Sequence, residues 1–185
     1  SIGISAYNEE KNIGKLLVSL KGQFEKFIYI GEILVFSDGS TDKTVEVAKK
    51  ISDTRIHVID DTYRQGKPYR LNQLFHRASG EIIVLFDADY IPTTRDTVER
   101  ICSPFRSRAF RGLSGGRKKA IRPQSLTGIG MTNVFHSFDI VRNNLRSGNN
   151  LYSFLSGVTA LHRDFATQLT LPLYSLCYDN HIYLE

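Results

Sequence analysis

The feature that most constrains the fold is an alternation of short apolar runs with segments whose apolar residues recur at helical spacing. Strands are expected at 2–6, 32–36, 55–59 and 81–86, and each of the first three is followed by a predicted helix. This order is typical of an α/β domain with a mostly parallel central sheet flanked by helices. The run at 81–86 is the most continuous, as a strand buried on both faces should be.

The second half of the chain is less regular. Thr93 and Asp96 predict a capping box that opens a helix ending near Arg106. A short strand near Leu113, an amphipathic helix over 129–141, a strand over 154–161 and the start of a helix at 179–185 follow. Because no repeat or linker interrupts the pattern, residues 1–185 are expected to form one domain.

The composition suits one core that needs no disulfide bonds. The chain has 185 residues, of which 41% are hydrophobic, and two cysteines, which we expect to be reduced thiols in a cytoplasmic protein. The sequence shows neither an apolar run long enough for a bilayer nor a signal peptide. It begins inside an apolar strand pattern, which indicates part of a longer protein.

Basic residues gather in one stretch between Arg106 and Arg122, within a net charge of +5. Such a stretch suits nucleic acid, an anionic membrane surface or a phosphorylated ligand, and charge alone does not distinguish them. A nucleic-acid partner has no other support, so none is predicted. Because the stretch leads into the amphipathic segment 129–141, peripheral membrane contact is one hypothesis, with a solvated basic face as the alternative.

Polar residues follow three of the predicted strands, at Ala6-Tyr7-Asn8-Glu9, Ser37-Asp38-Gly39-Ser40 and Asp87-Ala88-Asp89. The carboxyl ends of parallel strands meet at one edge of a sheet, which is where ligands bind in such folds. A turn at Ala88 would let both aspartates face one hard cation, Mg²⁺ or Mn²⁺. The alternative is that they are solvated turn residues.

The other polar residues suggest a nucleotide site at the same edge. Asp38 has a carboxylate that can accept a hydrogen bond from a base, and Tyr7 has a ring that can stack on one. Arg64-Gln65-Gly66-Lys67 precedes a predicted helix and is a plausible anion site. Asn72, one turn inside that helix, is predicted to reach the same ligand.

Taken together, these segments resemble the family 2 glycosyltransferases, which have the GT-A fold, a Rossmann-like fold of nucleotide-diphospho-sugar transferases. The matching segments are A-Y-N-E-E at 6–10, S-D-G-S-T-D at 37–42, R-Q-G-K at 64–67, L-N at 71–72, A-S-G-E-I-I-V at 78–84 and D-A-D at 87–89. They occur in the family's order and spacing over about the first hundred residues. The resemblance implies an inverting transferase with a nucleotide-sugar-binding half, 1–110, and an acceptor half, 111–185.

The resemblance also implies roles on the donor side. Ala6, Tyr7, Glu9 and Asp38 would surround the base and ribose, and Lys67 would lie near the nucleotide. Asp87 and Asp89 would hold the ribose, the diphosphate and the metal, with Asp89 also counted as catalytic, and Ala88 would belong to the nucleotide-sugar site. Ser37 departs from the family, since many members have a second aspartate there, but Asp38 is retained.

The acceptor side is implied less directly. Family members usually have an acidic pair near the acceptor, and its aspartate is the general base. Here the candidate base is Asp179, in Tyr178-Asp179-Asn180; the alternative is that Asp179 caps the terminal helix. The implied donor is a UDP- or GDP-sugar and the implied acceptor a saccharide or a lipid-linked molecule, in polysaccharide or cell-envelope biosynthesis.

Two other functions stay open. Nucleotidyltransferases have a related architecture and also use metal-binding aspartates, but they usually open with a glycine-rich phosphate loop, which residues 6–10 do not form. A non-catalytic module that binds nucleotide sugars or carbohydrates is the other alternative.

Overall fold

The computed structural model describes residues 1–107, 109–110, 112–116, 125, 127, 129–130, 132, 134, 137, 140, 144–145, 157–174 and 182. Its helices and strands, in chain order, are β1 (Ile2–Ala6), α1 (Ile13–Lys21), β2 (Ile33–Asp38), α2 (Thr44–Lys49), β3 (Ile56–Asp61), α3 (Lys67–Arg77), β4 (Ile82–Asp87), α4 (Thr97–Cys102), the 3₁₀ helix η1 (Ser103–Arg106), β5 (Leu113–Gly115), β6 (Val158–His162) and α6 (Arg163–Ala166).

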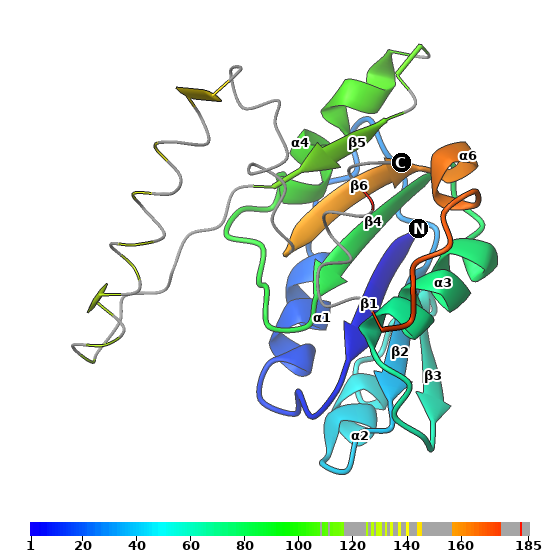
Figure 1. The fold of residues 1–185 in the computed structure, drawn as a ribbon, viewed down its shortest axis with the longest axis vertical. Helices are drawn as coiled ribbons and strands as arrows, with labels where there is room; N and C mark the ends of the chain where they lie inside the picture. The colour runs from blue at the N-terminus through cyan, green and yellow to red at the C-terminus, as the bar shows by residue number, and fades with distance from the viewer. Residues whose placement is uncertain are drawn as a thin grey trace.

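The strands form one six-stranded sheet with the order β3-β2-β1-β4-β6-β5 (Figure 1). The four strands β3, β2, β1 and β4 are parallel, whereas β6 runs antiparallel to β4 and β5 antiparallel to β6. The predicted fold class, a mostly parallel α/β sheet flanked by helices, is therefore confirmed.

Two apolar cores lie on opposite faces of the sheet. On one face Ile2 and Ile4 of β1 pack with Leu16 of α1, in a core that also includes α4. On the other face Leu74 of α3 packs against β2 and β4 in a second core. Gly3 allows this close approach, because a Cβ at that position would lie 2.1 Å from Leu74 Cδ1.

The predicted capping box before α4 is wrong. The helix begins at Thr97, and the Asp96 side chain makes no capping hydrogen bond to its backbone. Instead the Asp96 carboxylate accepts a hydrogen bond from the Thr94 hydroxyl at 2.5 Å. The Thr94 hydroxyl thus competes for the Asp96 carboxylate, which the predicted capping box would have turned back toward the backbone of Thr93.

The later elements agree in part with the prediction. β6 begins at Val158 and all five of its residues are buried, while 154–156 lie outside the described residues. In the segment 129–141, Ile129, Val134 and Ile140 are helical and exposed. Among the described residues, none of the helices has the length and apolar character that crossing a bilayer requires.

Candidate functional site

The order of the strands creates a crevice between the ends of β1 and β4. From β1 the chain continues to β2 and β3 on one side, then returns to place β4 on the other side of β1. Ligands of open α/β sheets bind at such a switch point, outside the carboxyl ends of the strands. The register pairs Ser5 with Asp87 and Ala6 with Ser37, so the three predicted polar strand ends meet there.

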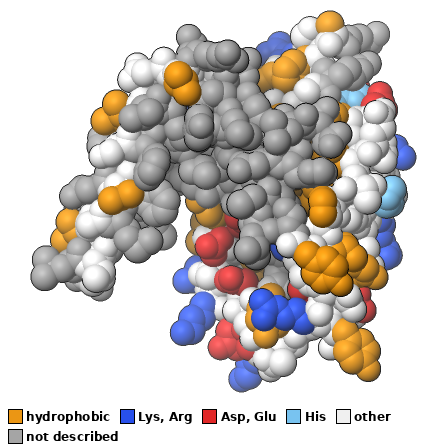
Figure 2. All heavy atoms as spheres, viewed as in Figure 1, with side chains coloured by type: hydrophobic (Ala, Val, Ile, Leu, Met, Phe, Trp, Pro, Cys, Tyr) orange, Lys and Arg blue, Asp and Glu red, His pale blue; other side chains and the backbone are white. Residues whose placement is uncertain are grey.

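A cleft of about 250 Å³ lies at this edge. It is lined by Ser5, Tyr7, Glu9, Asp38, Arg64, Gly66, Lys67, Asp87, Ala88 and Asp89. Acidic and basic side chains gather at the lower edge of the molecule in Figure 2, where the arrows of the parallel strands end in Figure 1. Ala6, also predicted for this site, is buried at the end of β1 directly before Tyr7.

Hydrogen bonds join the loop after β1 to the loop after β2. The amide N–H of Thr41 donates to Asn8 Oδ1 at 2.8 Å, and the amide N–H of Glu9 donates to Thr44 Oγ1 at 2.7 Å. Asn8 has a left-handed backbone, with φ of 54°, which asparagine tolerates better than most residues. The two loops therefore form one unit that presents Tyr7 and Glu9 to the cleft.

The Asp38 carboxylate organises a second wall of the cleft. It is only 3% exposed and accepts hydrogen bonds from the amides of Gln65 at 2.8 Å and Gly66 at 2.9 Å. It also accepts one from Arg70 Nε at 2.7 Å. Asp38 thus holds the segment 64–67 beside the cleft, a role that its sequence position did not reveal.

An arginine covers the ring of Tyr7. The guanidinium carbon of Arg64 lies 3.9 Å from the ring centroid, within cation–π range. Because Tyr7 directly follows β1 and Arg64 lies in the segment after β3, this contact joins the two walls of the cleft. A flat ring and a planar guanidinium are both suitable surfaces for stacking a nucleobase.

Charges are concentrated on the β4 side of the cleft. Lys67, the first residue of α3, forms an ion pair with half-buried Asp87. Asp89 is exposed, and no described residue donates a hydrogen bond to it. Burial, followed by the charges of Asp89 and Asp87, raises the pKa of Tyr90 to about 12. The Asp87-Ala88-Asp89 turn therefore carries two carboxylates, one of which is paired with Lys67.

Comparison with known proteins identifies the family. The sequence model described as Glycosyl transferase family 2 matches residues 1–168, which is most of the chain. The chain belongs to glycosyl transferase family 2. A curated relative, the 4,4'-diaponeurosporenoate glycosyltransferase of Staphylococcus aureus strain USA300, is 35% identical over 115 residues. Those residues are 61% of this chain and 30% of that relative.

Solved structures share the fold of this family 2 chain. The mannosyltransferase PcManGT of Pyrobaculum calidifontis, solved with GDP-Man and Mn²⁺, has a TM-score of 0.71 at 20% identity and covers 98% of this chain and 49% of its own. Staphylococcus aureus TarS 1–349 has a TM-score of 0.70 at 19% identity, with coverages of 99% and 53%. Glucosyl-3-phosphoglycerate synthase of Mycobacterium tuberculosis, solved with Mn²⁺ and UDP-Glc, has a TM-score of 0.60 at 22% identity, and the match covers 91% of this chain and 57% of the synthase.

The β4 turn of this family 2 chain has the donor atoms that a hard divalent cation needs. Mg²⁺ and Mn²⁺ prefer oxygen ligands, and Mg²⁺ is commonly held by one or two carboxylates together with substrate phosphates. Within the described part of the chain, no three His, Cys, Asp or Glu side chains are close enough to hold an ion by themselves. Asp87 and Asp89 therefore fit a cation that is shared with a bound diphosphate.

One predicted residue, Asn72, is not among those that line the cleft, and another lies outside the described part of the chain. The side-chain amide of Asn72 donates to Leu171 O at 2.9 Å and accepts from Leu171 N at 2.8 Å. It therefore fixes the segment after α6, and the expectation that Asn72 reaches the ligand does not agree with this geometry. Asp179 lies outside the described residues.

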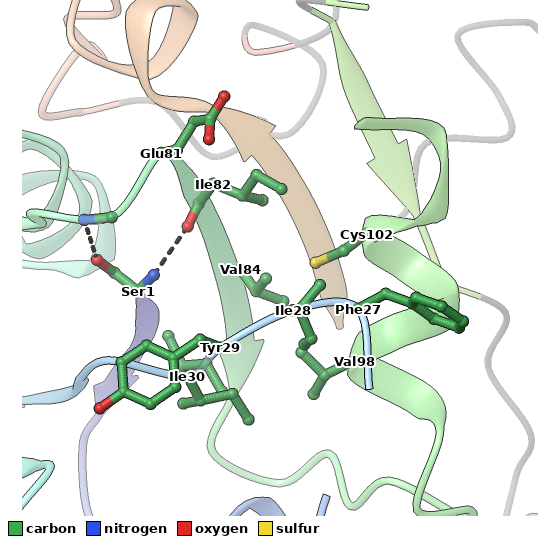
Figure 3. A pocket seen from close by; sticks show the side chains of 12 residues that line it. Ser1, Phe27, Ile28, Tyr29, Ile30, Glu81, Ile82, Val84, Val98 and Cys102 are labelled. Carbon is green, nitrogen blue, oxygen red and sulfur yellow. Dashed lines mark hydrogen bonds between the residues drawn. The ribbon is translucent and has the colours of Figure 1, made fainter. Parts of the chain in front are cut away.

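A second hollow, of about 260 Å³, lies at the opposite edge of the sheet. Figure 3 shows Ile82 and Val84 of β4 and Val98 of α4 around it, while Glu81 points away. This hollow is at the amino ends of β1 and β4, away from the three polar strand ends. None of the residues predicted for the nucleotide site lines it.

Proposed function

We propose that this family 2 chain is the catalytic core of an inverting, metal-assisted transferase that moves a sugar from a UDP- or GDP-sugar to an acceptor hydroxyl. The observation that carries the proposal is the cleft at the switch point between β1 and β4. It joins Asp87-Ala88-Asp89 with Tyr7, Glu9, Asp38 and Lys67, residues from four separate segments.

The donor half of the site follows from the charges and surfaces of the cleft. Tyr7 and Arg64 offer flat surfaces for the base, and the carboxylates of Glu9 and Asp38 are acceptors for ribose hydroxyls and base N–H groups. Lys67 would turn from Asp87 toward the diphosphate, since a lysine on a four-carbon stem contacts phosphate as a mobile point charge.

Asp87 and Asp89 would hold the metal ion and, through it, the diphosphate. Mg²⁺ or Mn²⁺ bound there would supply positive charge opposite the leaving group. Two of the neighbouring proteins, the mannosyltransferase and the glucosyl-3-phosphoglycerate synthase, were solved with Mn²⁺ and a nucleotide or nucleotide sugar, which favours a divalent cation in this role. Ala88, buried between the aspartates, leaves space for the diphosphate beside the backbone.

The acceptor half rests on Asp179, the proposed general base. Its carboxylate would take the proton of the acceptor hydroxyl as the hydroxyl oxygen attacks the anomeric carbon. The bond from that carbon to the diphosphate breaks on the opposite side, so the configuration inverts. We propose a saccharide or lipid-linked acceptor in the cytoplasm, and the name of the Staphylococcus aureus relative favours including non-saccharide acceptors in any screen.

The test is incubation with UDP- and GDP-sugars, Mn²⁺ and a panel of acceptors, followed by analysis of the released nucleotide. Release of nucleoside diphosphate that depends on the acceptor is the expected result. Release of pyrophosphate would identify a nucleotidyltransferase instead. Binding of a nucleotide sugar without turnover against any acceptor would indicate a binding module.

A further inference from the structure

Arg70 is a charged side chain that is completely buried and lies outside the cleft lining. It comes from α3 and is 0% exposed, among helix residues whose other inward side chains are apolar. The fork of its guanidinium has four protein partners. Nε donates to the Asp38 carboxylate at 2.7 Å, and Nη2 donates to Tyr63 O at 2.7 Å. Nη1 donates to the Asp61 carboxylate and also to Gln73 Oε1, the latter at 3.0 Å.

Packing alone gives no reason for an arginine here. Removing a guanidinium from water is costly, and well-packed apolar residues can often replace buried ion pairs with no loss of stability. Leu71 and Leu74 already supply the apolar contacts of α3. A methionine or leucine at position 70 would fill a similar volume, so the charge calls for an explanation beyond core filling.

The partners of Arg70 converge on one wall of the cleft. Asp38 lines the cleft and binds the amides of Gln65 and Gly66. Tyr63 begins the same segment, and its carbonyl is held by the other end of the guanidinium. Arg70 therefore holds both the carboxylate and the backbone segment that this carboxylate binds, from a position behind the wall.

Asp61 extends this arrangement to a third element. It is the last residue of β3 and pairs in register with Asp38, the last residue of β2. Two carboxylates side by side at neighbouring strand ends would repel each other, and the guanidinium between them offsets that repulsion. One side chain, Arg70, thus contacts both strand ends and the loop that follows β3.

We propose that Arg70 is a positioning residue that preorganises the nucleotide-recognising wall formed by Asp38 and residues 63–66. The proposal rests on the proposed function, because it assumes that this wall contacts the nucleotide. Arg70 itself does not touch the ligand. It fixes the Asp38 carboxylate and the Arg64–Lys67 backbone before the nucleotide arrives, so that binding does not have to order them.

The experiment uses calorimetry to measure the Kd of the full chain for UDP and for GDP, with Mn²⁺ present, in the wild type and in three variants. Arg70→Gln removes the charge and the fork, and Arg70→Lys keeps the charge alone. Arg55→Gln is the matched control. Arg55 is a half-buried arginine paired with Asp53 and Glu25 before β3, at the amino-terminal edge of the sheet.

We expect Arg70→Gln to raise the nucleotide Kd at least tenfold and Arg70→Lys to give an intermediate increase. Arg55→Gln should leave the Kd within twofold of the wild type despite a loss of stability. Hydrogen exchange provides a local measurement. The amides of Gln65 and Gly66 should exchange faster in the Arg70 variants, while those of α1 should stay protected.

Unchanged affinity in Arg70→Gln would overturn the proposal, as would an equal loss in Arg55→Gln, which would show a general effect of destabilisation. If Arg70→Gln does not fold, Arg70→Lys decides by the same criteria, with wild-type affinity counting against the proposal. A wild-type protein that binds neither nucleotide would overturn the proposed function itself, and the positioning role with it.

Discussion

Asp87 and Asp89 lie two residues apart but have different surroundings. Asp87 is half-buried and paired with Lys67, whereas Asp89 is exposed on the turn. A cation that arrives with the donor therefore meets the Asp89 carboxylate without first displacing a lysine. In the proposed mechanism Asp89 is the ligand on which metal-dependent donor binding depends most.

We expect Asp89→Asn to abolish the gain in donor affinity that Mn²⁺ provides, because an amide is a neutral and weaker ligand for a hard cation. Calorimetric titration of UDP or GDP with Mn²⁺ and with a chelator measures that gain. Asp96→Asn is the charge-matched control, since Asp96 is engaged by Thr94 before α4. A normal Mn²⁺ effect in Asp89→Asn would remove this residue from the metal site.

Lys67 leads to a second prediction at the same scale. Lys67→Met should raise the Kd for nucleoside diphosphates by about tenfold or more, which is the contribution expected of one charge-assisted hydrogen bond. The unphosphorylated nucleosides should bind nearly as before, because the lost charge acts on phosphate. Lys50→Met, which removes an exposed lysine paired with Glu46, controls for net charge. An equal loss for nucleosides would place Lys67 at the base or ribose.

The proposed base Asp179 gives a prediction that separates binding from transfer. Asp179→Asn should keep donor affinity and lose most of the turnover, with general-base catalysis typically contributing about 10²–10⁴-fold. Single-turnover assays with a productive donor and acceptor measure this. Asp164→Asn, on exposed Asp164 of α6, is the control. Turnover near the wild-type rate in Asp179→Asn would show that another group accepts the proton.

At the scale of elements, the sequence predicted most of the parallel half of the sheet. The strands of this half are apolar and end in polar residues, so the pattern located both the strands and the residues that face the cleft. The predicted strands 32–36 and 81–86 correspond to β2 and β4 within two residues. The cleft residues Tyr7, Asp38 and Asp87 follow from the same periodicity.

The sequence could not predict the roles of Arg70 and Asn72. A sequence pattern predicts that an arginine on the inner side of α3 is unfavourable, because it does not show the partners that allow its burial. These partners, Asp38 and Asp61, come from the strands β2 and β3. Asn72 is close to the cleft in sequence, but its amide binds Leu171, 99 residues away. Both side chains are determined by long-range contacts that periodicity does not contain.

The turn after β2 supplies a prediction about an element. Gly39 has φ of +67°, and a Cβ there would lie 2.7 Å from Arg64 N. Gly39→Ala should therefore push the segment 63–66 away and destabilise the protein by about 1–3 kcal/mol. Nucleotide affinity should fall as well. Chemical denaturation and calorimetry measure the two effects.

Gly22→Ala is the matched control, because a Cβ at Gly22 meets its nearest atoms at an ordinary 3.7 Å. Its backbone has φ of −90°, which alanine adopts readily. If Gly39→Ala behaved like Gly22→Ala in both measurements, the close approach of the two loops would not matter for the site.

At the scale of the whole molecule, the sequence predicted where the strands lie but not the direction of every strand in the sheet. An apolar run such as 158–162 is buried whether its strand runs parallel or antiparallel, so the pattern showed that β6 exists but not that it reverses beside β4. The switch point between β1 and β4 depends on the order of the parallel strands alone. The meeting of the polar strand ends at one cleft was therefore accessible from the sequence, whereas the placement of later segments was not.

Three exposed apolar side chains of the segment 129–141 lead to a prediction at this scale. In the segment 129–141, Ile129, Val134 and Ile140 are 46%, 54% and 52% exposed. The cluster Arg117-Lys118-Lys119 precedes this segment and lies outside the described residues. Exposed apolar side chains next to a basic cluster are the combination that binds anionic lipid surfaces.

We expect the protein to bind vesicles that contain phosphatidylglycerol or phosphatidylserine. Replacing Arg117, Lys118 and Lys119 with glutamine should weaken this binding strongly, since each basic residue near such a surface contributes about 1 kcal/mol. Binding should also fall as salt rises, because the lipid charge is screened.

The control replaces three exposed lysines of the α2 region with glutamine: Lys43, Lys49 and Lys50. If both triple variants lose binding equally, net charge alone is responsible, and if the wild type does not bind, the prediction of membrane contact is wrong.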